Sequence, residues 1–168
     1  EPYASQPALI KEAEYAGIPV ILLQDLFTRQ LNQVSRSAQQ ISKLMSQEPF
    51  DLIHSHAAIP GFAAELAVQI AYGKRLPHIS TVHAWGPDKA EWMRLQDRLL
   101  LNQVEWVHAV SDDVARFLIG EGVTPAKIVR IYNGCDFNRI DQLLAENVEK
   151  FSSVRKRHII GTVANLVE

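Results

Sequence analysis

Three histidines stand where predicted strands end, and their ring chemistry suits ligand binding. His54 and His56 are two residues apart at the end of an apolar segment, so both rings lie on one face of a strand. His83 ends the apolar segment 77–83. A neutral imidazole donates from one nitrogen and accepts at the other, so His83 is suited to hold a sugar hydroxyl or a backbone carbonyl.

Each of these histidines also has other interpretations. The spacing of His54 and His56 fits a pair of metal ligands. No third ligand follows at a suitable spacing, and we expect no metal. The alternatives are a hydrogen-bonded pair at the strand end and a contact of His56 alone with a ligand, and His83 has a structural alternative too. The residues alone leave these alternatives open.

Two further polar residues follow strands. Ser111 precedes two acids, which predicts a helix N-cap rather than a catalytic serine, since no G-x-S-x-G motif is present. Asn133 and Gly134 form a turn before Asp136, which would cap the next helix. The absence of G-x-G-x-x-G, Walker and C-x-x-C motifs gives no support to dinucleotide oxidoreductases or P-loop kinases.

The elements that position these residues alternate between strand and helix. Apolar runs predict strands, and three-four spacing of apolar residues predicts helices. The alternation indicates an α/β fold with a doubly wound parallel, Rossmann-like sheet, whose ligands bind beyond the carboxyl ends of the strands. The expected strands are 18–23, 51–56, 77–83, 106–110 and 127–132, and the expected helices are 8–15, 35–47, 62–72, 89–104 and those that begin after Ser111 and at Asp136, with a turn at 59–61.

The composition is that of an ordinary globular protein. Of 168 residues, 47% are hydrophobic and 21% charged. A net charge of -2 indicates no nucleic-acid partner. The single cysteine, Cys135, fits a reducing cytoplasm, and no apolar run reaches the roughly 20 residues that span a bilayer.

Five segments in order resemble family 4 glycosyltransferases of the GT-B fold. They are AEYAGIPVILL, PFDLIHSHAAIPGFAAELA, LPHISTVHAW, VHAVSDDVARFLIGEGVTPAKIVRIYNGCDFNRI and HIIGTVANLVE. The fourth contains the family's "a-V-S-…-I-x-N-G-x-D" signature. The resemblance implies a retaining, hexosyltransferase-like enzyme that moves a sugar from a nucleotide-sugar donor to a glycan or lipid-linked acceptor, with no cofactor and no metal.

The same resemblance assigns roles to residues. His83 would be catalytic, as a contact to the donor sugar or a stabiliser of charge, and Asn133 would lie near the interdomain cleft. His56 and the turn through Gly61 would line the acceptor side. The expected substrate-binding residues are His56, Gly61, Trp85, Ser111 and Asn133.

The resemblance also predicts the domain organisation. We expect residues 1–146 to be the N-terminal, acceptor-side domain without its first strands, 147–157 to be a linker, and 158–168 to be the first strand of a C-terminal donor domain. The family's Gly-rich loop and donor-side glutamates are not in these 168 residues, so we expect the isolated chain to be inactive and to dimerise or dissolve poorly.

The expected setting is the cytoplasm, at the inner face of the membrane, in the synthesis of cell-surface polysaccharide or lipopolysaccharide. Peripheral membrane contact is an open alternative. Two other functions also stay open: a non-catalytic module that binds a sugar or phosphate, and a fragment of a sugar-nucleotide epimerase.

Overall fold

The computed structural model describes residues 7–23, 26, 28–85 and 89–147. The chain separates into two compact units, Glu1–Tyr132 and Asn133–Glu168. The expected strand 158–168 and the linker 147–157, apart from Asn147 at a helix end, lie outside the described residues. The expected domain boundaries therefore remain predictions.

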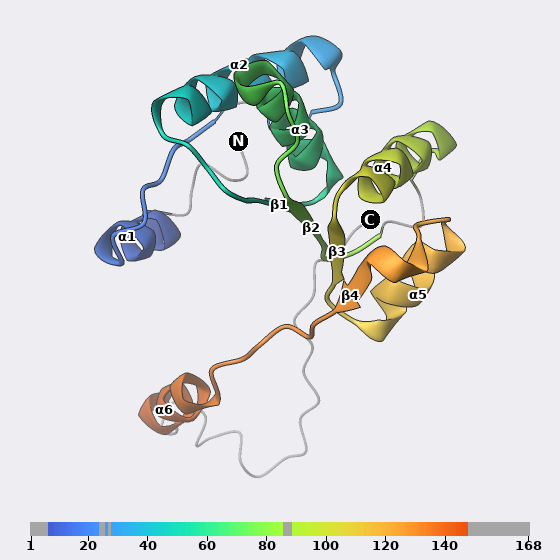
Figure 1. The fold of residues 1–168 in the computed structure, drawn as a ribbon. Helices are drawn as coiled ribbons and strands as arrows, with labels where there is room; N and C mark the ends of the chain where they lie inside the picture. The colour runs from blue at the N-terminus through green and yellow to red at the C-terminus, as the bar shows by residue number, and fades with distance from the viewer. Residues whose placement is uncertain (1–6, 24–25, 27, 86–88, 148–168) are drawn as a thin grey trace. The chain divides into compact units, whose positions relative to one another are not determined.

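The first unit is built on a four-stranded parallel sheet (Figure 1), which confirms the predicted α/β, Rossmann-like class. The strands follow one another in chain order: β1 (Ile53–His56), β2 (His78–Val82), β3 (Trp106–Ala109) and β4 (Ile128–Arg130). In the register, Ile53 is opposite His78, and Val107 is opposite both Ser80 and Ile128.

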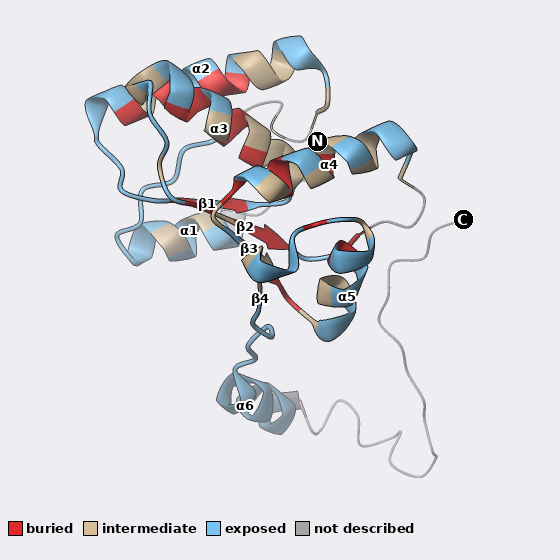
Figure 2. Ribbon diagram, turned by 45° about the vertical axis from the view of Figure 1, so that its right-hand side comes forward, coloured by how far each residue is buried: buried red, intermediate tan, exposed pale blue. Residues whose placement is uncertain are grey.

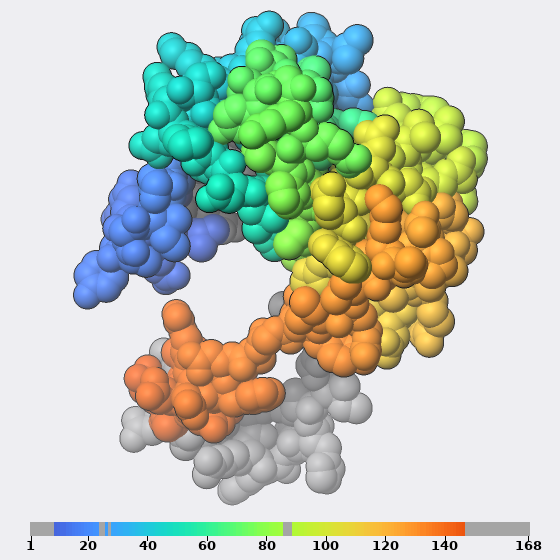
Figure 3. All heavy atoms as spheres, in the orientation of Figure 1, coloured from blue at the N-terminus to red at the C-terminus, as the bar shows by residue number. Residues whose placement is uncertain are grey.

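The helices of the first unit precede the strands or connect them. They are α1 (Pro7–Tyr15), α2 (Leu31–Gln47), α3 (Ala58–Tyr72), α4 (Glu91–Gln103) and α5 (Asp112–Gly120), with a short 3₁₀ helix at Pro125–Lys127. Strands in chain order with right-handed crossovers place successive connecting helices on the same face. From α2 to α5 these helices form a continuous layer of side chains (Figure 3).

Two apolar clusters hold this layer on the sheet, and Figure 2 shows the buried residues concentrated in the strands and on the inner sides of the helices. In one cluster, Leu100 of α4 and Leu118 of α5 pack with Val107 of β3. In the other, Ala38 of α2 and Ala67 of α3 pack with Ile53 of β1.

The turn predicted at residues 59–61 is wrong, because these residues form the first turn of α3. Pro60 is the third helical residue, where a backbone N–H has no partner within the helix, so proline is tolerated. Gly61 is buried against the sheet: a Cβ there would lie 2.7 Å from Leu100 Cδ2 and 3.0 Å from Ser55 Oγ. Glycine therefore permits the close approach of α3.

The strand predicted at residues 18–23 is also wrong. After α1, these residues have no regular secondary structure, and Ile18, Ile21 and Leu22 are exposed. The Ile18 N–H donates to the Ala13 carbonyl and so closes the end of α1. A strand needs a neighbouring backbone to bond, and no described strand pairs with this segment.

The second unit contains α6 (Phe137–Asn147). Its predicted cap is confirmed, since Asp136 Oδ1 accepts the Arg139 N–H at 3.0 Å. The remaining predicted strands and helices of the first unit are also found, with ends shifted by a few residues.

Candidate functional site

Four histidines gather on the face of the sheet that α3, α4 and α5 leave open. Side chains alternate along a strand, so Ser55 points toward the helices while His54 and His56 point away from them. Thr81 on β2 and His108 on β3 are register partners on this open face. His83 follows β2 directly and joins the group.

Hydrogen bonds around Thr81 determine which ring nitrogen donates and which accepts in His54 and His108. The Ile131 carbonyl can only accept, so His108 Nε2 donates to it at 2.9 Å. The bare Nδ1 of His108 then accepts the Thr81 hydroxyl at 2.9 Å. Thr81 Oγ1 in turn accepts from His54 Nε2 at 2.7 Å. The Ile131 carbonyl therefore sets the donor and the acceptor of each hydrogen bond in a series through His108 on β3, Thr81 on β2 and His54 on β1.

His56 and His83 form a second pair. His56 Nδ1 lies 2.9 Å from His83 Nε2, and the rings stack with centroids 5.2 Å apart. One of these nitrogens must donate and the other accept, so neutral rings leave one donor and one acceptor at the two outer nitrogens. The pair can therefore hold a hydroxyl from both sides.

Burial lowers the pKa of His56 below its usual 6.5, and the neighbouring rings of His54, His83 and His108 lower it further. The imidazole of His56 is thus kept neutral near neutral pH. A neutral His56 can share one proton with His83, whereas two imidazolium rings would repel each other at this distance.

Within the described part of the chain, no group of three or more His, Cys, Asp or Glu side chains is arranged to hold a metal ion. The metal alternative for His54 and His56 gains no third ligand from the fold. Both rings instead have histidine or threonine partners.

Ser111 lies at the carboxyl end of β3 and caps α5, where its Oγ accepts the Val114 N–H at 3.2 Å. The predicted N-cap is confirmed. Next to it, Asp112 pairs with Arg130 at 3.1 Å and accepts the Tyr132 hydroxyl at 2.9 Å. The first turn of α5 is thereby tied to β4.

Two other predicted site residues lie on the helix side of the sheet. Gly61 is enclosed by α4 and β1, as described above. Trp85 is buried in the same cluster as Leu100, with Lys89 Nζ 4.3 Å from its ring centroid. The histidine cluster contains neither of them, and their roles as ligand contacts remain predictions.

Asn133 is exposed and begins the second unit, and its role also remains a prediction. Thr81 and His108 were not identified as site residues from the sequence. The signal that could have found them is register, because Thr81 is opposite His56 on the neighbouring strand β2, and His108 is opposite Thr81 on β3.

Ala57, between His56 and α3, has φ 72° and ψ 160°, a region that favours glycine. Its N–H donates to the Thr81 carbonyl at 3.0 Å. The strained backbone conformation of Ala57 costs about 1–3 kcal/mol, and this hydrogen bond helps to hold it at the β1–α3 junction next to His56.

The sequence model of a protein family described as Glycosyltransferase Family 4 matches residues 3–139. No curated protein matches the chain.

Solved structures share the fold. A glycosyltransferase from Rickettsia africae is 20% identical, with a TM-score of 0.67 over 86% of this chain and 38% of that one. Anabaena HepE, in complex with UDP-glucose, is 21% identical, with a TM-score of 0.63 over 84% of this chain and 40% of its own. The chain thus spans about two fifths of their length.

An epimerase has the same fold. UDP-N-acetylglucosamine 2-epimerase from Rickettsia bellii is 11% identical, with a TM-score of 0.53 over 88% of this chain and 39% of that one. The fold is therefore common to two classes of enzyme, and the family match is what separates them.

Proposed function

Because the chain belongs to glycosyltransferase family 4, we propose that the complete protein transfers a sugar from a nucleotide-sugar to a glycan or lipid-linked acceptor. The family match over residues 3–139 carries this proposal. The histidine pair at the carboxyl end of β1 and β2 supports it, since ligands of parallel sheets bind beyond that edge.

In this proposal, His83 is the catalytic residue. Its outer nitrogen, Nδ1, contacts the donor sugar or stabilises charge near the reacting carbon. His56 bonds His83 Nε2, which fixes the plane of the ring, and its own outer nitrogen, Nε2, faces the acceptor side. Gly61, Trp85, Ser111 and Asn133 complete the proposed substrate-binding set.

The proposed reaction retains the configuration of the sugar. The bond between the anomeric carbon and the diphosphate oxygen breaks, and an acceptor hydroxyl attacks from the same face. Its proton passes to the leaving phosphate. The proposal includes no metal, and stabilisation of the leaving diphosphate is assigned to the donor domain of the complete protein.

The proposed setting is the cytoplasm, at the inner face of the membrane, in the synthesis of cell-surface polysaccharide or lipopolysaccharide. None of the helices in the described part of the chain is long and apolar enough to cross a bilayer. The isolated chain, which spans 38–40% of similar enzymes, is proposed to be inactive without a donor domain.

The test is an assay of the full-length protein and of the isolated chain with a panel of nucleotide-sugars. We expect sugar release or transfer by the full-length protein, and a loss of about 100-fold or more in His83→Ala, in the range of one lost electrostatic contact. Arg116→Gln, on the exposed surface of α5, is the control. Turnover by the isolated chain would contradict its proposed inactivity, and full activity of His83→Ala would contradict the role of His83.

A further inference from the structure

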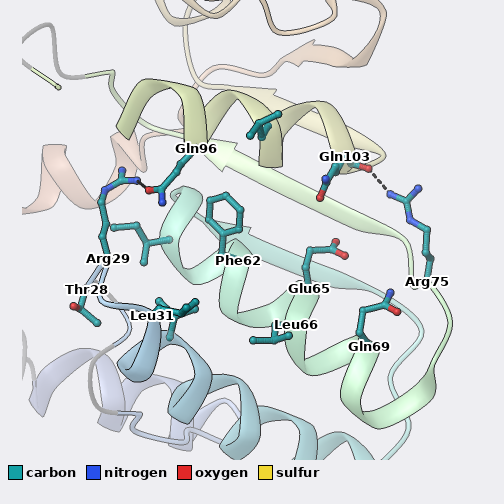
Figure 4. Close-up of a pocket in the computed structure, with 13 residues that line it drawn as sticks. Thr28, Arg29, Leu31, Phe62, Glu65, Leu66, Gln69, Arg75, Gln96 and Gln103 are labelled. Carbon is teal, nitrogen blue, oxygen red and sulfur yellow. Dashed lines mark hydrogen bonds between the residues drawn. The ribbon is translucent and has the colours of Figure 1, made fainter. Parts of the chain in front are cut away.

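A cavity of about 810 Å³ lies between α2, α3 and α4 (Figure 4). This volume is in the range of small-molecule sites. The helices that line it cover one face of the sheet, and the histidine cluster lies on the other. The cavity is therefore distinct from the candidate site.

The middle of the cavity is apolar. Leu31 and Val34 of α2, Phe62 and Leu66 of α3, and Leu99 of α4 line it. Phe62 and Leu66 are four residues apart and so share one face of α3. Leu99 remains 52% exposed although its helix packs on the sheet. Apolar side chains from three helices therefore face the same cavity.

Polar groups lie at both ends of this apolar middle. Arg29 and Gln96 lie together at one end, and Gln69, Gln103 and Arg75 at the other (Figure 4). A glutamine carboxamide offers both donors and an acceptor, which matches the hydroxyl groups of a polyol.

The guanidinium groups at the two ends are already bonded to other groups of the protein. Arg29 Nη2 bonds both oxygens of Asp97, at 2.8 and 3.1 Å, and Asp97 is buried. Arg75 donates to the Gln103 carbonyl and lies 3.7 Å from Glu105. Lys89 Nζ bonds the same Asp97 carboxylate at 2.8 Å. Both guanidinium groups of the lining are thus already bonded to protein acceptors, and Glu65 adds a carboxylate to the cavity wall, so a neutral ligand suits the lining better than an anion.

Glu65 provides a fixed acceptor on the cavity wall. Its Oε1 accepts from His78 Nδ1 at 2.6 Å, and His78 is completely buried. The other ring nitrogen of His78 bonds Ser55 Oγ at 2.8 Å in the core. His78 thus fixes the position of the Glu65 carboxylate from the core side, while 19% of the Glu65 side chain is exposed. A preorganised carboxylate beside apolar surface is suited to accept from a ligand hydroxyl.

We propose that this cavity binds a neutral amphiphile, with an apolar chain along Phe62, Leu66 and Leu99. A hydroxylated head group donates to Glu65 and bonds the carboxamide of Gln69. This site goes beyond the proposed transfer reaction, because the proposed catalytic His83 and its partner His56 lie on the other face of the sheet and none of the proposed substrate-binding residues lines the cavity.

The test is calorimetric titration of the full-length protein with n-octyl β-D-glucoside below its critical micelle concentration. We expect saturable binding that Leu99→Gln weakens about tenfold, because the variant places an amide against the alkyl chain. Ile70→Gln is the matched control: Ile70 on α3 is also 52% exposed but does not line the cavity. It is expected to change the affinity by about twofold at most.

A second variant and a second probe test the head group. Glu65→Gln is expected to weaken octyl glucoside binding about fivefold or more, in the range of a hydrogen bond to a charged group. Its melting temperature shows whether the fold is kept, and Leu99→Gln carries the test if it is not. Octyl phosphate is expected to bind more weakly than octyl glucoside. No saturable binding, equal effects of Leu99→Gln and Ile70→Gln, or preference for octyl phosphate would each overturn the proposal.

Discussion

At the scale of single residues, the hydroxyl of Thr81 connects histidines from the strands on either side of β2. It donates to His108 and accepts from His54, and it is almost fully buried. Threonine provides one donor and an acceptor in a short, stiff side chain, as this position requires. The open face of the sheet thus has one series of hydrogen bonds, from His54 through Thr81 to His108, and one histidine pair, His56 and His83.

The assignment of donors and acceptors around Thr81 can be tested with Thr81→Val. We expect His108 to keep its proton on Nε2, because the Ile131 carbonyl remains, while His54 loses its preference for Nε2. The loss of the hydroxyl should cost about 1 kcal/mol of stability. Nitrogen-15 spectra of the rings report the tautomers, with Thr81→Ser as the control that keeps this assignment. An unchanged His54 spectrum in Thr81→Val would show that the link is absent.

The lowered pKa of His56 predicts a dependence of stability on pH. Because the pKa is lower in the folded state, the unfolded chain binds a proton first as the pH falls. The contribution of His56 is therefore complete above about pH 6.5 and is lost as the pH falls through that value toward the folded pKa. Urea unfolding at about pH 7.5 and about pH 5.5 measures it. We expect a smaller pH effect in His56→Asn, and equal effects in the two proteins would refute this assignment.

At the scale of elements, the helices were the more predictable part. Apolar spacing located α2 over residues 35–47, and the structure starts it four residues earlier, at Leu31. The strand predicted at residues 18–23 from its apolar run was wrong. An apolar run indicates that a segment can be buried, but it does not show that a neighbouring strand is present to pair with it. The sequence pattern also placed a turn at Gly61, where glycine instead allows helix α3 to approach β1 and α4.

The docking of α3 can be tested with Gly61→Ala. The added methyl would lie 2.7 Å from Leu100 Cδ2 and 3.0 Å from Ser55 Oγ, so we expect a loss of about 1–3 kcal/mol in the free energy of unfolding. Gly120→Ala on α5 is the matched control, since nothing lies within 4 Å of its added Cβ. Alanine favours a helix, so this control should keep or raise stability. A Gly61→Ala protein as stable as the control would mean that α3 does not pack so closely.

At the scale of the whole chain, apolar side chains remain exposed on the open side of the sheet and after α1. Trp106 of β3 is 49% exposed and Val129 of β4 is 39% exposed, and Ile18, Ile21 and Leu22 are more exposed still. Exposed apolar surface of this kind is a site of association in soluble proteins. These exposed apolar residues are therefore where we expect the chain to associate with other copies if it dimerises or dissolves poorly.

Self-association of the isolated chain can be measured by sedimentation at several concentrations. We expect a concentration-dependent shift from monomer to larger species. Trp106→Ser should weaken this association about tenfold, because a large apolar side chain leaves the exposed surface. Leu144→Ser, on α6 of the second unit and 61% exposed, is the comparison variant. A wild-type chain that stays monomeric at every concentration would contradict the expectation.

The sequence by itself determined the alternation of strands and helices, the parallel sheet and the position of His56 and His83 at strand ends. These features follow from local periodicity and from the order of motifs along the chain. Tertiary structure alone decided that His56 bonds His83, that Thr81 links His54 to His108, and that Gly61 and Trp85 lie on the helix side. It also decided the cavity between α2, α3 and α4. The physical reason is that strand register and helix docking join residues far apart in the chain, and each depends on how side chains from several elements pack at once.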